Sequence, residues 1–201
     1  NLGSKLLQND YNGDGKADLT WNKVDGTVAL WTQDGVNTTA VSAPIGPFAG
    51  WSVFDSQHDF NGDGKSDLLW KNTDGRASIW LMDGINTLDM SAPMGPFAGW
   101  TVADAKGDYN GDGKADLRWQ NVDGSTALWL MDGVNTLAVS APIGPFAGWS
   151  VKDGSTDANG DGKSDLIWTN TDGRAAVWTM DGINTMDASA PMGPFAGWSL
   201  V

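Results

Sequence analysis

The stretch DYNGDGKADL, residues 10–19, places three aspartates and an asparagine at alternating positions around two glycines. It returns as DFNGDGKSDL at 59–68, as DYNGDGKADL at 108–117 and as DANGDGKSDL at 157–166. The four copies start 49 residues apart, and a constant spacing of this length is typical of repeat proteins. The sequence therefore predicts four similar units, none of which is large enough to bury a core alone.

The oxygen-bearing side chains of the loop have the spacing of a calcium site. Asp10, Asn12, Asp14 and Asp18 occupy positions one, three, five and nine, and the carbonyl of Lys16 falls at position seven. Ca²⁺ prefers all-oxygen ligands in a flexible ring, whereas zinc prefers nitrogen or sulfur and Mg²⁺ needs a stricter octahedron. We therefore expect about one Ca²⁺ per unit. The predicted ligands are Asp10, Asn12, Asp14, Lys16, Asp18, Asp59, Asn61, Asp63, Lys65, Asp67, Asp108, Asn110, Asp112, Lys114, Asp116, Asp157, Asn159, Asp161, Lys163 and Asp165.

Two other interpretations explain the loop less well. A helix-loop-helix calcium site needs a bidentate glutamate at position twelve, where the four units carry Trp21, Trp70, Trp119 and Trp168. Plain hairpin turns explain Asn-Gly and Asp-Gly pairs in general, but such turns do not require the three aspartates that recur in every loop. The recurring carboxylates favour the metal site.

Short apolar runs alternate with turns between the loops. In the unit that begins at Trp51, the runs WSVFDSQHD, SDLLWKN, RASIWLM and NTLDMSA have the length and composition of strands, and no segment has helical periodicity. A four-stranded meander repeated along a chain is typical of a β-propeller. We predict one all-β propeller domain over residues 1–201, with four-stranded blades at 2–50, 51–99, 100–148 and 149–197, and with residues 198–201 starting or closing a further blade.

A pair of charges alternates between units. The second unit carries Arg76 and Asp89, the fourth carries Arg174 and Asp187, and the first and third lack both charges. A two-residue Asp83-Gly84 turn would place Arg76 diagonal to Asp89 on the same face of the hairpin. We therefore expect a structural cross-strand ion pair in the second and fourth units.

The pattern D-x-N-x-D-G-x-x-D before a strand, in tandem units, resembles the FG-GAP/VCBS repeat family, which includes the propeller of integrin α subunits and many bacterial extracellular proteins. The resemblance covers nearly the whole chain. It implies that the loops bind calcium and join the first two strands of each blade, and that the protein is extracellular or at the cell surface. Position three is Asn here and mostly Asp in integrins, which implies weaker binding, suited to millimolar extracellular calcium.

The number of blades in the finished ring is open. Four units fit a closed four-bladed ring, an eight-bladed ring made by two chains, or a piece of a longer array, and family propellers commonly have more than four blades. Leu2–Lys5 occupy the same repeat positions as Trp198–Val201, so the first strand begins twice. This favours a homodimer in which the tail GWSLV pairs with the first blade of the partner.

Composition argues against several functional classes. The chain has no cysteine and one histidine, and its carboxylates lie mostly in the loops, so we expect no enzyme activity. His58 has no counterpart in the other units, and we interpret it as an exposed or loop-packing residue. The net charge of −13 argues against nucleic acid as a partner, and no apolar run is long enough to predict membrane insertion.

Each complete unit carries tryptophan at three places. Trp70 and Trp80 lie inside predicted strands, and we expect both in the core. The third set follows the segment GPFAG and is predicted to line a pocket between neighbouring blades, with packing at the blade junction as the alternative. This set is Trp51, Trp100, Trp149 and Trp198.

Aromatic faces of this kind stack on sugars. Some fungal lectins of the family bind sugars at repeated sites on a calcium-bearing propeller. The resulting hypothesis is an extracellular, calcium-stabilised module that binds a glycan or another surface partner, with lectin activity as its concrete form. The alternative is a structural or engineered symmetric scaffold that mediates protein association or oligomerisation.

Overall fold

The computed structural model describes residues 9–200, which form fifteen β-strands arranged in four antiparallel sheets. No part of the described chain is helical, so it contains no helix that could cross a membrane. Each sheet is a meander, because its strands are paired in chain order. The predicted all-β architecture of tandem blades is confirmed.

The first sheet consists of β1 (Leu19–Asn22), β2 (Val28–Asp34) and β3 (Asn37–Val41). The second consists of β4 (Trp51–His58), β5 (Asp67–Asn72), β6 (Ala77–Asp83) and β7 (Asn86–Met90). The third consists of β8 (Trp100–Asp104), β9 (Leu117–Asn121), β10 (Thr126–Asp132) and β11 (Asn135–Val139). The fourth consists of β12 (Trp149–Thr156), β13 (Asp165–Asn170), β14 (Ala175–Asp181) and β15 (Asn184–Ala188).

The second, third and fourth sheets have the four strands that the sequence predicts. In the first unit the described residues form three strands, and the remaining predicted strand falls largely outside the described residues. Leu2–Lys5, where the sequence predicts that the first strand begins twice, lie outside the described residues, as does Val201 at the end of the predicted tail.

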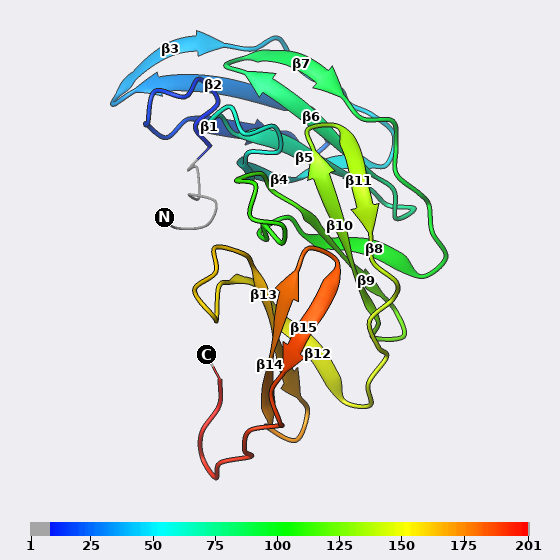
Figure 1. Ribbon diagram of the computed structural model, residues 1–201. Helices are drawn as coiled ribbons and strands as arrows, with labels where there is room; N and C mark the ends of the chain where they lie inside the picture. The colour runs from blue at the N-terminus through cyan, green and yellow to red at the C-terminus, as the bar shows by residue number, and fades with distance from the viewer. Residues whose placement is uncertain (1–8, 201) are drawn as a thin grey trace.

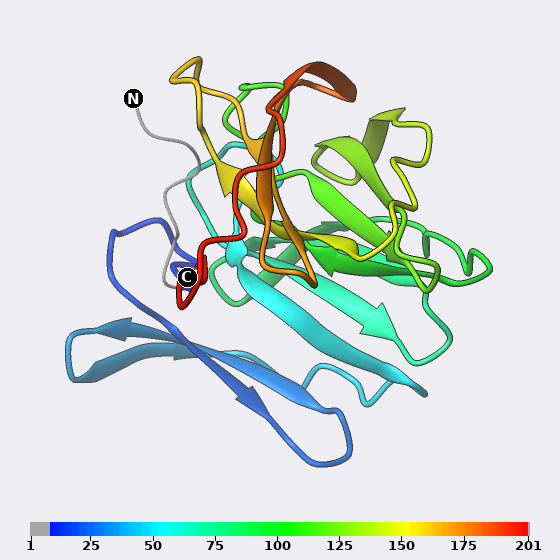
Figure 2. The same ribbon diagram turned by 90° about the horizontal axis from the view of Figure 1, so that it is seen from below.

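The four sheets follow one another along an open arc (Figure 1). The first sheet lies at one end of the arc and the fourth at the other, with the second and third between them. The view from below shows the four sheets fanning out like blades (Figure 2). Within the described residues, the chain therefore forms a row of blades with two free ends.

Hydrophobic clusters lie between successive blades. One cluster joins Tyr11, Val28 and Leu30 of the first unit to Leu68 and Trp70 of the second. Two further clusters join the second blade to the third and the third blade to the fourth. The second strand of a middle blade is covered on both faces, and this explains its continuous apolar run LLW in β5.

Backbone hydrogen bonds also cross each junction. The N–H of Gly84 donates to the carbonyl of Tyr11 at 2.7 Å, and the N–H of Ser66 donates to the carbonyl of Asp10 at 2.7 Å. The bond of Gly84 recurs as Gly133 to Phe60 and as Gly182 to Tyr109. Each calcium-type loop is thus tied to the blade that follows it.

The expected ion pair between Arg76 and Asp89 is wrong. The turn between β6 and β7 pairs Asp83 with Asn86, and a bulge after Leu81 places Asp89 opposite Leu81. Nε of Arg76 instead lies 2.8 Å from Oδ2 of Asp74 in the preceding turn. In the fourth blade Arg174 likewise pairs with Asp172. A β-bulge shifts register by one residue, and this shift cannot be read from turn residues alone.

Candidate functional site

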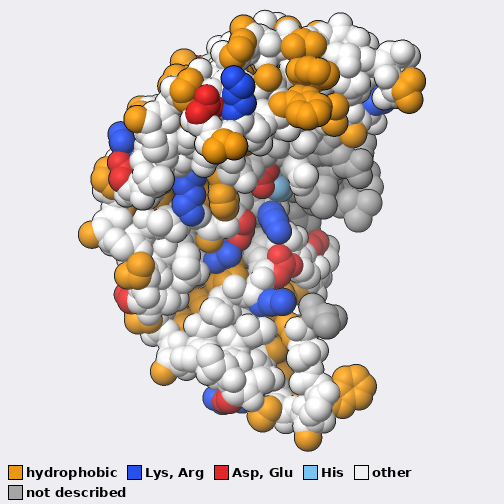
Figure 3. All heavy atoms as spheres, turned by 180° about the vertical axis from the view of Figure 1, so that it is seen from behind, with side chains coloured by type: hydrophobic (Ala, Val, Ile, Leu, Met, Phe, Trp, Pro, Cys, Tyr) orange, Lys and Arg blue, Asp and Glu red, His pale blue; other side chains and the backbone are white. Residues whose placement is uncertain are grey.

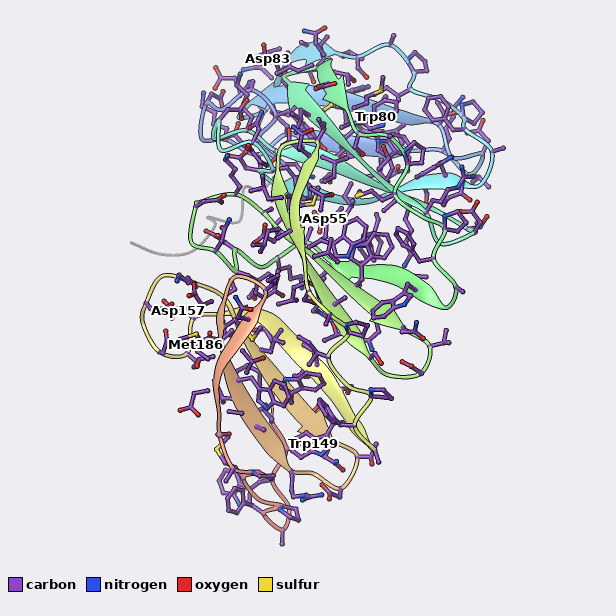
Figure 4. The ribbon with its side chains drawn as sticks, turned by 45° about the vertical axis from the view of Figure 1, so that its right-hand side comes forward. Asp55, Trp80, Asp83, Trp149, Asp157 and Met186 are labelled. Atoms are coloured by element: carbon purple, nitrogen blue, oxygen red, sulfur yellow. The ribbon has the colours of Figure 1, made fainter. Side chains whose placement is uncertain are left out.

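Two kinds of candidate site lie at opposite ends of each blade. Figure 4 shows this for the fourth blade, where Asp157 lies in the calcium-type loop and Trp149 lies at the far end of the sheet. The loop precedes the second strand, whereas Trp149 begins the first strand, β12. The two strands are antiparallel, so a residue that begins β12 lies beside the end of β13.

The first aspartate of each loop organises the backbone around itself. Oδ1 of Asp10 accepts hydrogen bonds from the N–H groups of Gly13 at 2.8 Å and Asp14 at 3.1 Å, and Oδ2 accepts one from Gly15 at 2.8 Å. Gly13 and Gly15 have φ values of 74° and 81°, in the left-handed region that favours glycine. The same first position binds the corresponding glycines in the other loops through Asp59, Asp108 and Asp157.

The residues at positions three and five close smaller turns. Oδ1 of Asn12 accepts from the N–H of Asp14 at 3.0 Å, and Oδ1 of Asp14 accepts from the N–H of Lys16 at 2.9 Å. The Nζ of Lys16 lies 2.9 Å from Oδ1 of Asp34 and 3.5 Å from Oδ2 of Asp14. The loop therefore holds its side-chain oxygens in place through its own backbone.

The aspartate at position nine has a role that the sequence reasoning missed. Oδ2 of Asp116 accepts from the N–H of Tyr109, and Oδ1 accepts from the N–H of Met131, each at 2.8 Å. The buried carboxylate thus joins the start of its loop to the third strand of the blade, β10. Asp18, Asp67 and Asp165 make the corresponding pairs of bonds.

Burial and neighbouring charge change the acidity of these groups. Burial raises the pKa of Asp67 to about 7 against the opposing effect of its hydrogen bonds from Phe60 and Met82, and the charges of Asp59 and Asp63 raise it further. Burial likewise raises the pKa of Asp116 to about 7, with a further contribution from the charges of Asp108 and Asp112. The carboxylates at positions one and five therefore repel the carboxylate at position nine.

The fit to a cation is partial. Among residues 9–200, no group of three or more His, Asp or Glu side chains is arranged so that it could hold a metal ion. Positions one, three, five and nine supply carboxylate and amide oxygens, and both oxygens of the aspartates at positions one and nine already accept backbone hydrogen bonds. The donor chemistry matches Ca²⁺, and calcium binding remains a prediction.

Three aromatic pockets occur at the other end of the blades. The pocket of the second blade has a volume of about 390 Å³, and its walls include Phe48, Trp51, Trp70 and Trp80 together with Ser91. The corresponding pockets of the third and fourth blades measure about 230 Å³ and 280 Å³. Their aromatic walls are Phe97, Trp100, Trp119 and Trp129 in the third blade and Phe146, Trp149, Trp168 and Trp178 in the fourth.

Ring contacts hold the pocket walls together. Phe48 packs on Trp70 and Trp80, with centroid distances of 5.8 and 5.7 Å, and the two indoles lie 5.1 Å apart. Trp70 is buried, as expected, whereas Trp80 is half-buried and faces the pocket. The guanidinium of Arg76 lies 5.4 Å from the ring centroid of Trp51.

The segment GPFAG that connects two blades is held by hydrogen bonds from the next blade. The side-chain amide of Asn72 donates to the carbonyl of Ala49 at 3.2 Å, and the N–H of Thr73 donates to the carbonyl of Gly50 at 2.9 Å. These bonds fix the GPFAG segment beside the NTDG turn of the next blade. Trp51, Trp100 and Trp149 each line one of the three pockets, whereas Trp198 lines none of them and is 80% exposed.

A donor in each pocket wall is left unused. Trp70, Trp119 and Trp168 are buried, and the Nε1 of each has no hydrogen-bond partner in the structure. All three occupy the same repeat position, so the unpaired indole N–H is a repeated feature of the blade. Buried donors are usually paired, and a repeated exception needs an explanation.

One protein-family model matches part of the chain. Residues 59–119 match the model described as an FG-GAP-like repeat. Over this segment the chain is similar to FG-GAP-like repeats. The matched FG-GAP-like segment begins at the loop aspartate Asp59, passes through the second blade and ends at Trp119 in the third. It therefore includes two complete calcium-type loops and the strands β5, β6, β7 and β8.

The other comparisons add no function to the FG-GAP-like repeat. The search of curated proteins gives no match. Among solved structures, the crystal structure of the computationally designed Ika8 protein is 12% identical to this chain, covering 93% of this chain and 90% of that chain with a TM-score of 0.20. A TM-score this low supports no conclusion.

His58, at the end of β4 in the second blade, has a structural role. It is buried rather than exposed, and its Nδ1 lies 2.8 Å from Oδ1 of Asp55, three residues earlier in β4. Asp55 also accepts a hydrogen bond from the N–H of Gln57. The interpretation as a packing residue fits this geometry, whereas the interpretation as an exposed residue was wrong.

Proposed function

We propose that this protein is an extracellular, calcium-stabilised module of FG-GAP-like blades that binds carbohydrate through its aromatic pockets. The observation that carries the proposal is the threefold recurrence of one pocket, each made of three tryptophans and one phenylalanine. Scattered exposed aromatics need no explanation, whereas the same concave arrangement at three repeat positions does.

The chemistry of the pocket suits a sugar ring. The pocket of the second blade is largely aromatic, and a pyranose presents apolar C–H faces that stack on such rings. Ser78 and Ser91 add hydroxyl groups to the same wall, and hydroxyls fix the orientation of a polyhydroxylated ligand. The volume of about 390 Å³ lies within the range of small-ligand sites.

The three pockets differ in one charged group. Arg76 lies over Trp51 and Arg174 lies over Trp149, with guanidinium-to-centroid distances of 5.4 and 5.6 Å. The third blade carries Ser125 at this position. Each of these guanidiniums also pairs with an aspartate, Asp74 or Asp172, so the second and fourth pockets border an ion pair where the third has no arginine.

Repetition compensates for weak individual sites. A single shallow site of this kind is expected to bind weakly, but several sites on one rigid arc engage a glycan-coated surface together. The arc of blades keeps the three pockets at fixed relative positions (Figure 1). A dense surface glycan is thus a better target than a free monosaccharide.

Calcium would act on the scaffold rather than on the sugar. Positions one, three and five and the carbonyl at position seven would hold the ion, for example Asp10, Asn12, Asp14 and Lys16 in the first loop. The bound cation would neutralise carboxylates that repel one another, and the loops and pockets lie at opposite ends of the blade. Chelation should therefore weaken the fold before it alters the pocket.

A glycan array probed with the purified chain, first in millimolar calcium and then after chelation, tests the proposal. We expect calcium-dependent binding to a defined group of glycans. A silent array in both conditions, from protein whose circular dichroism shows intact sheets, would contradict it and favour the scaffold function.

A further inference from the structure

The two ends of the arc carry matching halves of the junction that occurs three times inside the chain. Each internal junction places the connecting segment and loop of one blade against the first strands of the next blade. Among residues 9–200, the fourth blade has its connecting segment and loop and is followed by no further sheet, and the first blade has receiving strands and is preceded by none. Figure 3 shows the crescent from behind, with apolar side chains near both of its ends.

The receiving face of the first blade is exposed where its equivalents are buried. Trp21 is 52% exposed and Leu19 is 42% exposed, whereas Trp70 and Leu68, at the same repeat positions of the second blade, are buried. Trp21 and Trp31 form the same tilted pair as Trp70 and Trp80, with ring centroids 5.3 Å apart. The first blade therefore presents a ready aromatic surface without its cover.

The missing cover is present at the other end of the chain. Phe48, Phe97 and Phe146 each pack on a tryptophan pair of the next blade. Their equivalent Phe195 is 65% exposed, compared with about 40% for the other three, and Trp198 is 80% exposed. Among the described residues, an uncovered tryptophan pair and an uncovered phenylalanine thus stand at opposite ends of the arc.

The space around repeated glycines also shows that the fourth blade lacks the neighbour that the other blades have. A Cβ added at Gly50, Gly99 or Gly148 would lie 2.9–3.0 Å from an Asn or Thr side chain in the turn of the next blade, whereas one at Gly197 would meet nothing within 4 Å. In the loops, a Cβ at Gly111 would lie 3.2 Å from the next blade's Lys163, whereas one at Gly160 would again meet nothing within 4 Å.

We infer that a second copy of this chain occupies both free ends, so that two chains close an eight-bladed ring. The fourth blade of each copy would dock on the first blade of the other, through the contacts that already join the blades within one chain. Phe195 would cover Trp21 and Trp31 of the other copy, and the N–H of Gly35 would reach the carbonyl of Ala158 as Gly84 reaches that of Tyr11. A closed two-fold arrangement leaves neither end exposed.

The pairing would also build a fourth pocket from two chains. One copy would supply three walls of this pocket from the repeat positions of Trp70, Trp80 and Ser91, namely Trp21, Trp31 and Ser42. The other copy would supply the remaining two, Phe195 and Trp198, from the repeat positions of Phe48 and Trp51. Each ring would then carry eight pockets in place of two sets of three. The sugar occupancy of this pocket rests on the proposed function, whereas the assembly does not.

The intermolecular junction should be weaker than the internal ones. Ala158 stands where Tyr11, Phe60 and Tyr109 fill the internal junctions, and it is exposed. The junction between copies therefore lacks one buried aromatic ring, although a dimer forms it twice. We expect association that depends on protein concentration.

Sedimentation equilibrium of the full chain, without any glycan, tests the assembly over a range of concentrations. We expect a mass twice the 21.2 kDa of one chain at high protein concentration. Phe195→Ala and Trp21→Ala should each shift the protein to the mass of one chain, whereas Phe54→Ala, at an exposed phenylalanine of β4, should not. Circular dichroism of each variant confirms that the sheets remain.

Mixing the two variants tests the head-to-tail geometry. A pair formed by one Phe195→Ala chain and one Trp21→Ala chain keeps one intact junction, whereas each variant alone keeps none. The mixture should therefore associate more strongly than either variant alone. A single-chain mass at all concentrations, a mass above two chains, or a dimer unaffected by both variants would overturn the inference. None of these results depends on sugar binding.

Discussion

Oδ1 of Asp116 accepts a hydrogen bond from the backbone N–H of Met131 at 2.8 Å, which joins the calcium-type loop to the third strand of its blade. The other oxygen of Asp116 accepts from the N–H of Tyr109. One side chain therefore holds together two segments that are separated in sequence, and the arrangement recurs in every unit. Position nine of the loop supports the sheet whether or not a cation is present.

Replacing Asp116 with alanine should destabilise the fold because two buried N–H groups lose their acceptor. The expected loss in the free energy of unfolding is roughly 1–3 kcal/mol for each N–H. Asp116→Asn keeps one acceptor oxygen and should lose less. Asp89→Ala, which removes the same charge from the exposed strand β7, is the control and should change little. Urea denaturation of the three variants measures the effect, and equal stability of Asp116→Ala and the control would contradict the assigned role.

Acidification should stabilise the metal-free protein over the range in which Asp67 and Asp116 gain protons. Burial raises the pKa of both carboxyls to about 7, so the folded chain binds these protons more tightly than the unfolded chain. Their stabilising contribution is complete below the unfolded pKa of about 3.9 and is lost as the pH rises through about 7. Urea denaturation in metal-free buffer should therefore give higher stability at about pH 5.5 than at about pH 8.

The double variant Asp67→Asn, Asp116→Asn is the control for this pH dependence. It removes the two titrating groups and should flatten the profile over the same range. A wild-type protein that is more stable at the higher pH in metal-free buffer would show that these carboxyls are not the groups that govern it.

Removal of calcium should lower the melting temperature because four anionic loops would lose their cations. A ligand at a hundredfold excess over its Kd stabilises the folded state by about 2.7 kcal/mol per site. Differential scanning calorimetry in millimolar calcium, in equal magnesium and in chelator measures the effect, and only calcium should give the higher melting temperature. An unchanged melting temperature in chelator would contradict the prediction that the loops bind calcium.

Replacing Trp119, which is buried between the second and third blades, should lower the free energy of unfolding more than replacing an exposed residue. Trp119 is buried and contacts Phe97 and Trp129 at centroid distances of 5.6 and 5.1 Å. Trp119→Ala should lower the free energy of unfolding by about 3–5 kcal/mol. Val122→Ala, at an exposed turn residue three positions later, is the matched control. Equal urea midpoints for the two variants would contradict the view that the hydrophobic cluster around Trp119, between the second and third blades, stabilises the fold.

Repetition made most of the fold predictable. The loop at 10–19 and its three copies define the units, and the alternation of apolar runs with Asp-Gly turns gives the strands of the second, third and fourth blades. The bulge after Leu81 was not predictable, because an extra residue in one strand leaves no mark in turn composition. The error about Arg76 and Asp89 follows from that bulge and from the turn itself, which pairs Asp83 with Asn86 instead of closing at Asp83-Gly84.

The candidate sites were predictable to different degrees. Oxygen spacing marked the loops, but it could not show that both oxygens of Asp18 accept backbone hydrogen bonds, since one of the donors, Gln33, lies in β2. The sequence predicted that Trp51 lines a pocket, yet it could not show that Trp80 would also face that pocket. The signal available for Trp80 was its alternation with Leu81 along a strand.

The most direct test of the account is the glycan-array profile of a variant in which Trp51, Trp100 and Trp149 are all alanine, measured beside wild type in calcium. Phe54→Ala serves as the matched aromatic control on the same strand as Trp51. The account predicts that the triple variant, with its sheets intact by circular dichroism, loses the glycans that wild type and the control bind. Retention of the same glycans at the same strength by the triple variant would contradict it.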